Sequence, residues 1–165
     1  MSTDKPPAGL QIPISNAQNM QSKNIVRRGE GADYDYSQDH CFVKLTSDQT
    51  NGELCFVEDI LKPGFYLGRH HHKRMFEVFY ILEGEVEFIF DDESIIARPG
   101  DTVNVPPNVW HAAKSEKGAR MLTFFKDGQF DRYLERLSQM SDADFADADR
   151  MEKLAHEFDI YEAPA

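Results

Sequence analysis

The chain has 165 residues, of which 41% are hydrophobic and 12% aromatic, so one domain with a packed core is expected and extensive disorder is disfavoured. Its formal net charge is −11, from 29 acidic and 18 basic residues. This balance disfavours nucleic acid and anionic membrane surfaces as partners, because both are bound mainly through Lys and Arg.

The sequence carries no signal for export or for a membrane span. Residues 1–20 lack the basic start and apolar run of a secretory signal, and no stretch approaches the roughly 18 apolar residues of a spanning helix. Cys41 and Cys55, the two cysteines, are too few for a disulfide framework and lie in apolar, strand-like segments. We therefore expect buried, reduced thiols and a cytoplasmic location.

Residues 1–38 are interpreted as an N-terminal arm. Residues 1–24 are rich in Pro, Gln, Asn and Ser, which is typical of a lead-in segment. Within this segment Leu10, Ile12 and Ile14 recur at every second position and could add one edge strand.

Residues 39–126 are predicted to form a series of short β-strands. Turn sequences such as Lys62-Pro63-Gly64 separate the apolar runs. Closely spaced strands with this punctuation predict an all-β fold, either an antiparallel sandwich or a barrel. The runs are CFVKLT, ELCFVEDIL, FYLGRHHH, EVFYIL, EVEFIF, SIIA, TVNVP, WHAAK and RMLTFF.

Residues 127–165 are predicted to form a helical extension, because the hydrophobic spacing changes there to i, i+3, i+4, i+7. Two helices are expected, packed on the outside of the barrel, and Ser141 is in place to cap the second. Their apolar faces consist of Phe130, Tyr133, Leu134 and Leu137 in the first helix, and of Met151, Leu154, Ala155 and Phe158 in the second.

A group of His and Glu residues lies among the central strands. Alternate side chains of a strand share a face, so His70 and His72 point the same way and His71 points oppositely. A turn after His72 would let the next strand bring Glu77 beside them, and a barrel could bring His111 to the same interior point. The predicted metal ligands are therefore His70, His72, Glu77 and His111.

Three imidazole nitrogens and one carboxylate suit one divalent transition-metal ion per chain, namely Fe, Mn, Ni, Co, Cu or Zn. They do not suit Ca or Mg, which prefer oxygen shells. The single carboxylate leaves the site with a net positive charge, which favours an anionic substrate or a dioxygen-derived anion. Four protein ligands also leave one or two positions open on a five- or six-coordinate ion, as in catalytic sites.

These residues carry a resemblance to the cupin superfamily. Gly64-x5-His70-x-His72-x4-Glu77-x6-Gly84 matches the first cupin motif at every fixed position, and Gly100-x5-Pro106-x-Asn108-x2-His111 matches the second. Asn108 stands where the family usually has Gly, and Ser115 where it often has Asn. Asn tolerates a positive φ, so the turn is expected to survive. The resemblance covers roughly residues 41–126.

Within the superfamily, the sequence looks like single-domain, quercetin-dioxygenase-like cupins. This resemblance implies a double-stranded β-helix, or jelly-roll barrel, and often a homodimer. It also implies an oxidoreductase of the dioxygenase type that acts on a small oxygenated organic substrate, with Glu77 as a ligand and a candidate proton acceptor. Two alternatives stay open, because cupins have many activities. One is an oxygen-independent metal-dependent isomerase, lyase or decarboxylase, and the other is a small-molecule-binding cupin without catalysis.

Other polar and aromatic residues have simpler interpretations. Phe79 and Ile81 share the strand face of Glu77, so core packing is expected, with contact in a substrate pocket as a secondary role. Arg69 and Lys73 could reach an anionic substrate, although a solvated strand edge is the more common role. The residues interpreted as structural or surface groups are His40, His71 and His156, and the run Asp142, Asp144, Asp147 and Asp149, which lacks the Gly and terminal Glu of a calcium loop.

Overall fold

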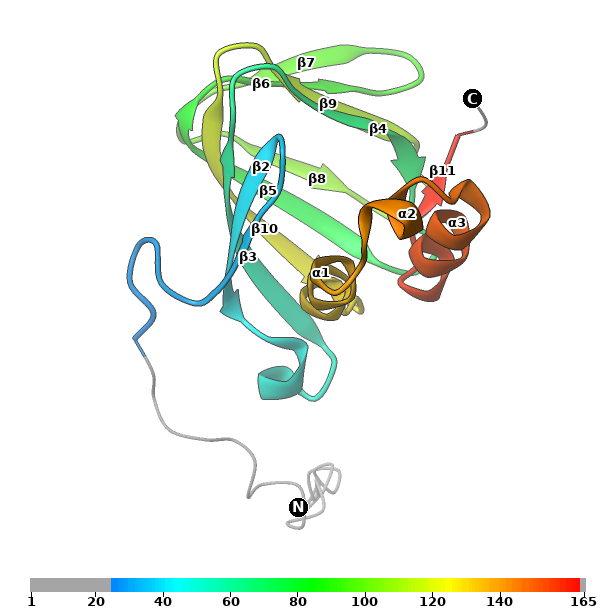
Figure 1. Ribbon diagram of the computed structural model, residues 1–165. Helices are drawn as coiled ribbons and strands as arrows, with labels where there is room; N and C mark the ends of the chain where they lie inside the picture. The colour runs from blue at the N-terminus through cyan, green and yellow to red at the C-terminus, as the bar shows by residue number, and fades with distance from the viewer. Residues whose placement is uncertain (1–24, 164–165) are drawn as a thin grey trace, which may run out of the picture.

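Two antiparallel β-sheets and three short helices make up the computed structural model (Figure 1), which describes residues 25–163. The predicted all-β jelly-roll architecture with C-terminal helices is therefore confirmed. The segment around Leu10, Ile12 and Ile14, considered above as an edge strand, lies outside the described residues.

The larger sheet has six strands in the order β1-β2-β3-β10-β5-β8. Strands far apart in the chain lie side by side in it, since β10 pairs with both β3 and β5. β1 lies within the range 1–38 interpreted as an arm, and β2 begins at residue 39. The bounds are β1 Ala32–Asp35, β2 Asp39–Leu45, β3 Leu54–Leu61, β5 Phe76–Gly84, β8 Thr102–Val105 and β10 Ala119–Lys126.

The smaller sheet has five strands in the order β11-β4-β9-β6-β7 and faces the larger sheet (Figure 1). β4 and β9 are antiparallel neighbours, and their register places His70 opposite His111. The bounds are β4 Phe65–His71, β6 Val86–Ile89, β7 Ser94–Ala97, β9 His111–Ser115 and β11 Tyr161–Glu162.

Alternate residues of each strand point inward and fill the space between the sheets. Phe79, Ile81 and Phe88 are at most 1% exposed and belong to one hydrophobic cluster. Tyr80, which separates two of them on β5, is 38% exposed. This alternation of buried and exposed positions is the local pattern that made the strands predictable from the sequence.

The first helix, α1 (Phe130–Ser138), packs against inward-facing residues of the larger sheet. Its buried Leu134 belongs to a cluster that includes Cys55 and Phe125. The strand register pairs Cys55 with Phe125 and Phe125 with Glu77, so these residues share the inner face. The expectation that the helices pack outside the barrel is therefore wrong for α1, because this helix covers apolar side chains of the inner face. Both cysteines belong to the same cluster, buried and reduced, as expected.

The acidic stretch after α1 forms two short helices instead of the single predicted one. α2 (Asp142–Phe145) is capped by Ser141, as predicted. α3 (Ala148–Glu157) is capped by Asp147, whose Oδ1 accepts a hydrogen bond from the amide of Arg150 at 3.1 Å. The chain then returns to the smaller sheet as β11, a strand that was not predicted.

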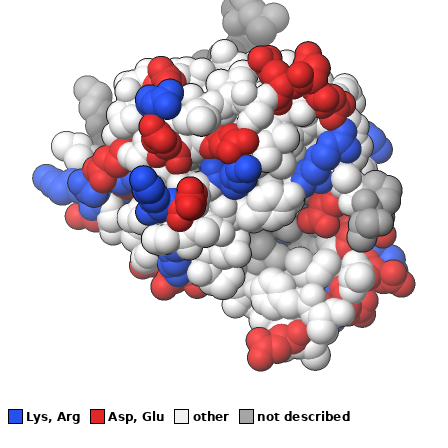
Figure 2. Space-filling model, turned by 90° about the horizontal axis from the view of Figure 1, so that it is seen from above, with Lys and Arg blue, Asp and Glu red and all other residues white. Residues whose placement is uncertain are grey.

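The outer face of the smaller sheet carries charges of both signs. Figure 2 views the molecule from this side and shows acidic and basic side chains lying next to one another. Two ion pairs along this sheet are Lys114–Glu87 at 3.1 Å and Arg98–Glu85 at 2.9 Å. No helix within residues 25–163 is long and apolar enough to cross a membrane.

Candidate metal centre

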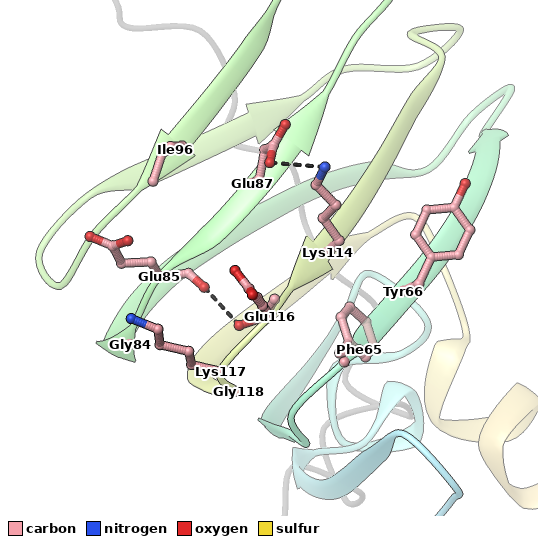
Figure 3. Close-up of a pocket in the computed structure, with 12 residues that line it drawn as sticks. Phe65, Tyr66, Gly84, Glu85, Glu87, Ile96, Lys114, Glu116, Lys117 and Gly118 are labelled. Atoms are coloured by element: carbon pink, nitrogen blue, oxygen red, sulfur yellow. Dashed lines mark hydrogen bonds and ion pairs between the residues drawn. The ribbon is translucent and has the colours of Figure 1, made fainter.

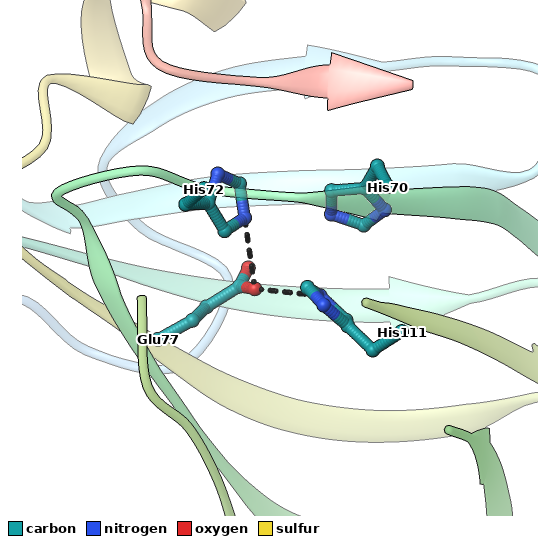
Figure 4. Close-up of side chains that lie close together, drawn as sticks. All are labelled: His70, His72, Glu77 and His111. Atoms are coloured by element: carbon teal, nitrogen blue, oxygen red, sulfur yellow. Dashed lines mark hydrogen bonds and ion pairs between the residues drawn. The ribbon is translucent and has the colours of Figure 1, made fainter. Parts of the chain in front are cut away.

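Strands of both sheets bring His70, His72, Glu77 and His111 to one point in the barrel (Figure 4). His70 lies near the end of β4, and His111 begins β9 as its register partner. His72 follows β4 directly, and Glu77 projects from β5 of the opposite sheet. The structure therefore brings together all four predicted ligands.

The turn before β9 adopts the backbone conformation expected from the second sequence motif. Asn108 has a φ of 65°, in the left-handed region that Asn tolerates. Its amide donates a hydrogen bond to the carbonyl oxygen of His72 at 2.6 Å. The turn thus ties the segment that leads into His111 to the segment that carries His72.

The distances between the donor atoms fit a single ion. Each of the four side chains offers one donor atom, and these atoms all lie within 4.8 Å of one another. Oε2 of Glu77 lies 3.3 Å from Nε2 of His72 and 3.1 Å from Nε2 of His111. Metal–ligand bonds of about 2.1 Å place neighbouring donors roughly 3.0 to 3.4 Å apart in octahedral or tetrahedral shells. Both separations from Glu77 fit a shared ion, and the four side chains together could hold one transition-metal ion.

The outer nitrogen, Nδ1, of each of the three imidazoles faces a backbone carbonyl oxygen. A carbonyl oxygen can only accept a hydrogen bond, so in the neutral ring Nδ1 carries the hydrogen and Nε2 presents its lone pair to the centre. Histidines that bind metals are commonly oriented in this way. The three contacts are His70 to Gly68 at 2.8 Å, His72 to Asp159 at 2.9 Å and His111 to Val109 at 3.1 Å.

The donors are shielded from water, because their exposed fractions are 5% for His70, 3% for His72 and for Glu77, and 0% for His111. Burial alone would raise the pKa of Glu77, but Nε2 of His111 and of His72 donate hydrogen bonds to it when these rings are protonated, and this contact holds the pKa well below its usual value. Burial and the neighbouring His111 lower the pKa of His70 to about 4. Burial lowers the pKa of His72, whereas the hydrogen bond with Glu77 raises it, and the net shift is upward. An ionised Glu77 and a neutral His70 are the forms that a metal ion requires.

The chain segment that builds this centre matches a known family. Residues 57–125 match the cupin domain, and all four donors lie within this range. These residues are a cupin domain. The resemblance stated from the two sequence motifs is thereby confirmed, and α1, α2, α3 and β11 lie wholly beyond the matched range.

A curated relative of this chain is quercetin 2,3-dioxygenase from Bacillus subtilis, which is 28% identical over 89 residues. The match covers 53% of this chain and 26% of the relative, so the chain spans about a quarter of that enzyme's length.

Solved structures share the cupin fold at low sequence identity. KdgF from a Halomonas species has a TM-score of 0.58 at 18% identity, over 66% of this chain and 99% of that protein. An RmlC-like cupin from Shewanella frigidimarina has a TM-score of 0.58 at 24% identity, over 68% and 98% of the two chains. A predicted oxalate decarboxylase from Thermotoga maritima has a TM-score of 0.57 at 20% identity, over 62% and 98%. These similarities show the fold alone.

The histidines that were not assigned as ligands lie away from the centre of the cupin. His71 follows a donor in sequence, but its ring centroid lies 4.3 Å from that of Trp110 and 5.3 Å from that of Tyr161. His40 is on β2 and His156 is on α3, and neither belongs to the donor group. The alternation of side chains along a strand therefore correctly predicted that His70 and His72 face the donor group and that His71 does not.

Phe79 and Ile81 line the interior next to Glu77 on β5, and they are 1% and 0% exposed. The ring centroid of Phe79 lies 6.5 Å from that of His111, so Phe79 forms part of the wall beside the donors. Core packing is the observed role of both residues, and substrate contact stays a prediction.

Arg69 and Lys73, considered above as a solvated strand edge, contact aromatic side chains. Arg69 forms an ion pair with Asp91, and its guanidinium carbon lies 4.6 Å from the ring centroid of Trp110. The ammonium of Lys73 lies 3.7 Å from the ring centroid of Tyr161. Both cations thus pack on aromatic rings beside the end of β4 that carries His70.

A second polar group lies on the inner face of the larger sheet. Asp39 and Asp59 flank the thiol of Cys41, and donor atoms of the three residues lie within 4.8 Å of one another. Burial, together with the charge of Asp39, raises the pKa of Asp59 well above its usual value, and burial also raises the pKa of Asp39. The environment therefore favours the protonated form of Asp59, in contrast to the ionised Glu77. Sequence reasoning missed this group because Asp59 lies on β3, apart from Asp39 and Cys41 on β2, and the three residues form no motif.

A groove of about 780 Å³ lies at the other end of β4 and β9 (Figure 3). Phe65 and Ser115 line it and are register partners at the ends of these strands opposite to His70 and His111. At about 3.3 Å per residue, the groove lies roughly 15 Å from the donors along the strands. None of the four donors lines this groove, so it is not the opening of the metal centre.

Proposed function

We propose that the protein binds one divalent transition-metal ion through His70, His72, Glu77 and His111 and acts as an oxidoreductase of the dioxygenase type on a small oxygenated organic substrate. The observation that carries the proposal is the convergence of three imidazole nitrogens and one ionised carboxylate, with donor atoms within 4.8 Å of one another. The distant similarity to quercetin 2,3-dioxygenase supports the choice of reaction.

The residues of the centre would have different roles in the reaction. A bound ion would supply Lewis acidity and open coordination positions for an oxygen-bearing substrate. The donor set has one negative charge, so it leaves part of a divalent charge uncompensated and favours the anionic form of an enolisable substrate. Glu77 is the ionised group placed to accept the hydroxyl proton of that substrate. Phe79 and Phe88, with ring centroids 4.8 Å apart, help to exclude water from the interior.

Oxygen consumption tests the proposal directly. Purified protein loaded separately with Fe, Mn, Co, Ni, Cu or Zn is assayed over a panel of flavonols and diketones, with His111→Ala as the inactive control. We expect uptake with at least one pair of metal and substrate in the parent protein and none in the variant. Absence of uptake for every pair would reject the dioxygenase proposal.

The same panel separates the two alternatives. Product that forms equally well in an anaerobic chamber would identify an isomerase, lyase or decarboxylase that uses the ion as a Lewis acid. Tight binding of a small molecule without any product would identify a binding cupin. The homodimer and the cytoplasmic location expected from the sequence stay predictions, and sedimentation velocity tests the first of them.

A further inference from the structure

The carboxylate of Asp159 is bound to the turn between two of the metal donors. It accepts hydrogen bonds from the amides of Lys73, Arg74 and Met75, at 3.2, 2.8 and 2.8 Å. Asp159 is 3% and Met75 1% exposed, so loss of the bond between them would leave a buried amide group without a ready substitute from water. The shape of this turn therefore depends on a side chain that follows it by more than 80 positions in the chain.

The backbone of Asp159 contacts a donor directly. Its carbonyl oxygen accepts a hydrogen bond from Nδ1 of His72 at 2.9 Å. In His70 and His111 the corresponding acceptor is a carbonyl two positions earlier in the same segment. His72 is thus the donor whose ring orientation and tautomer are set from outside residues 57–125, the range that matches the cupin domain.

The residues after Asp159 extend this contact along β4. β11 pairs with the metal-binding end of β4, with Glu162 opposite His70. The amide of Ala163 then donates to the carbonyl oxygen of Arg69 at 2.9 Å. We call residues 159–163 the C-terminal latch. They hold the end of β4, which carries His70, and the turn between His72 and Glu77.

We infer that the C-terminal latch is a positioning element of the metal centre and that Asp159 is its central residue. The inference rests on the metal binding proposed above and adds a requirement for a segment beyond the matched cupin domain. Asp159 acts through His72 and through the turn that leads to Glu77, and it does not itself point a side chain at the ion. A donor that is already oriented by hydrogen bonds loses less conformational freedom when the ion binds, so affinity depends on the latch.

Binding of Co²⁺ to the full chain tests this inference. Asp159→Gly removes the carboxylate but keeps the carbonyl oxygen and suits the φ of 64° at this position. We expect Co²⁺ to bind roughly 10- to 100-fold more weakly than to the parent, with a changed visible absorption spectrum of the bound ion. Asp159→Asn keeps the side-chain volume and one acceptor oxygen, so its loss of affinity should be smaller. The Asn variant also provides the measurement if the Gly variant does not fold.

Asp147→Ala is the matched control. It removes the cap of α3 in the same C-terminal extension but leaves every contact of the latch in place. We expect its Co²⁺ affinity and spectrum to equal those of the parent.

Three outcomes would overturn the inference. Unchanged affinity and spectrum in both Asp159 variants would show that the latch does not position the donors, while the metal centre itself would stand. Equal losses in the Asp159 variants and in Asp147→Ala would assign the effect to general loosening of the extension. If the parent takes up no Co²⁺, the proposed metal function fails, and the role of the latch fails with it.

Discussion

Nε2 of His111 lies 3.1 Å from Oε2 of Glu77, although the two residues are 34 positions apart and belong to strands of different sheets. This contact exists only when the two sheets face each other. The metal centre is consequently a property of the packed barrel, and ion binding there is linked to folding.

Replacement of a donor should remove metal, whereas replacement of its neighbour should not. His111→Ala deletes one of the four donors, so we expect the affinity for the ion to fall by more than about 100-fold, beyond the effect expected from losing outer hydrogen bonds. His71→Ala is the matched control, because this ring packs on Trp110 and Tyr161. Elemental analysis of protein purified without a His tag gives the metal content. Metal retained by His111→Ala would contradict the assignment of this ligand.

A metal ion should raise the melting temperature of the metal-free protein. Free ion at 100 times its dissociation constant stabilises the folded state by about 2.7 kcal/mol. Glu77→Gln keeps the size of the side chain but removes its charge, so most of this stabilisation should disappear. Differential scanning calorimetry with and without the ion measures both effects. An undiminished rise in Glu77→Gln would indicate that the ion binds elsewhere, for example beside Asp39 and Cys41.

The buried Asp59 should make the metal-free protein less stable as the pH rises. Burial and the charge of Asp39 raise its pKa in the folded state, whereas an unfolded chain has an Asp pKa of about 3.9. Between these two values the folded state binds more protons than the unfolded state, so the free energy of unfolding falls with increasing pH, by about 1.4 kcal/mol for each unit of pKa difference.

Asp59→Asn removes this titration. We expect the variant to gain stability relative to the parent as the pH rises from about 4 through the raised folded pKa of Asp59. Urea unfolding at pH 5, 6, 7 and 8 in the presence of a chelator measures the difference, and Asp92→Asn, in an exposed turn, is the control. A constant difference between variant and parent across this range would count against the raised pKa.

Two glycines of the first sequence motif should respond differently to substitution by Ala. Gly64 has a φ of 84° and open space around the position of a Cβ atom, so Gly64→Ala should cost about 1 to 2 kcal/mol for the left-handed backbone. Gly84 has a φ of 78°, and its Cβ would lie 2.6 Å from the carbonyl oxygen of Gly118. Gly84→Ala should therefore cost clearly more. Equal free energies of unfolding for the two variants would show that the backbone near Gly118 can move aside.

The sequence by itself determined which side chains could serve as metal donors. The inward direction of His70 and His72 and the outward direction of His71 follow from the period-two geometry of a strand, which is a local property. The positive φ at Asn108 was likewise predictable, because backbone preferences depend on the residue and its immediate neighbours.

Only the tertiary structure decided what surrounds those donors. The placement of α1 against the inner face, the grouping of Asp39 with Asp59, and the contact of Asp159 with His72 all join segments that are distant in the chain. β11 consists only of Tyr161 and Glu162, which is too short a strand to predict from periodicity. Such contacts arise from the packing of whole elements against one another, and packing between distant segments leaves no periodic pattern in the sequence of either one.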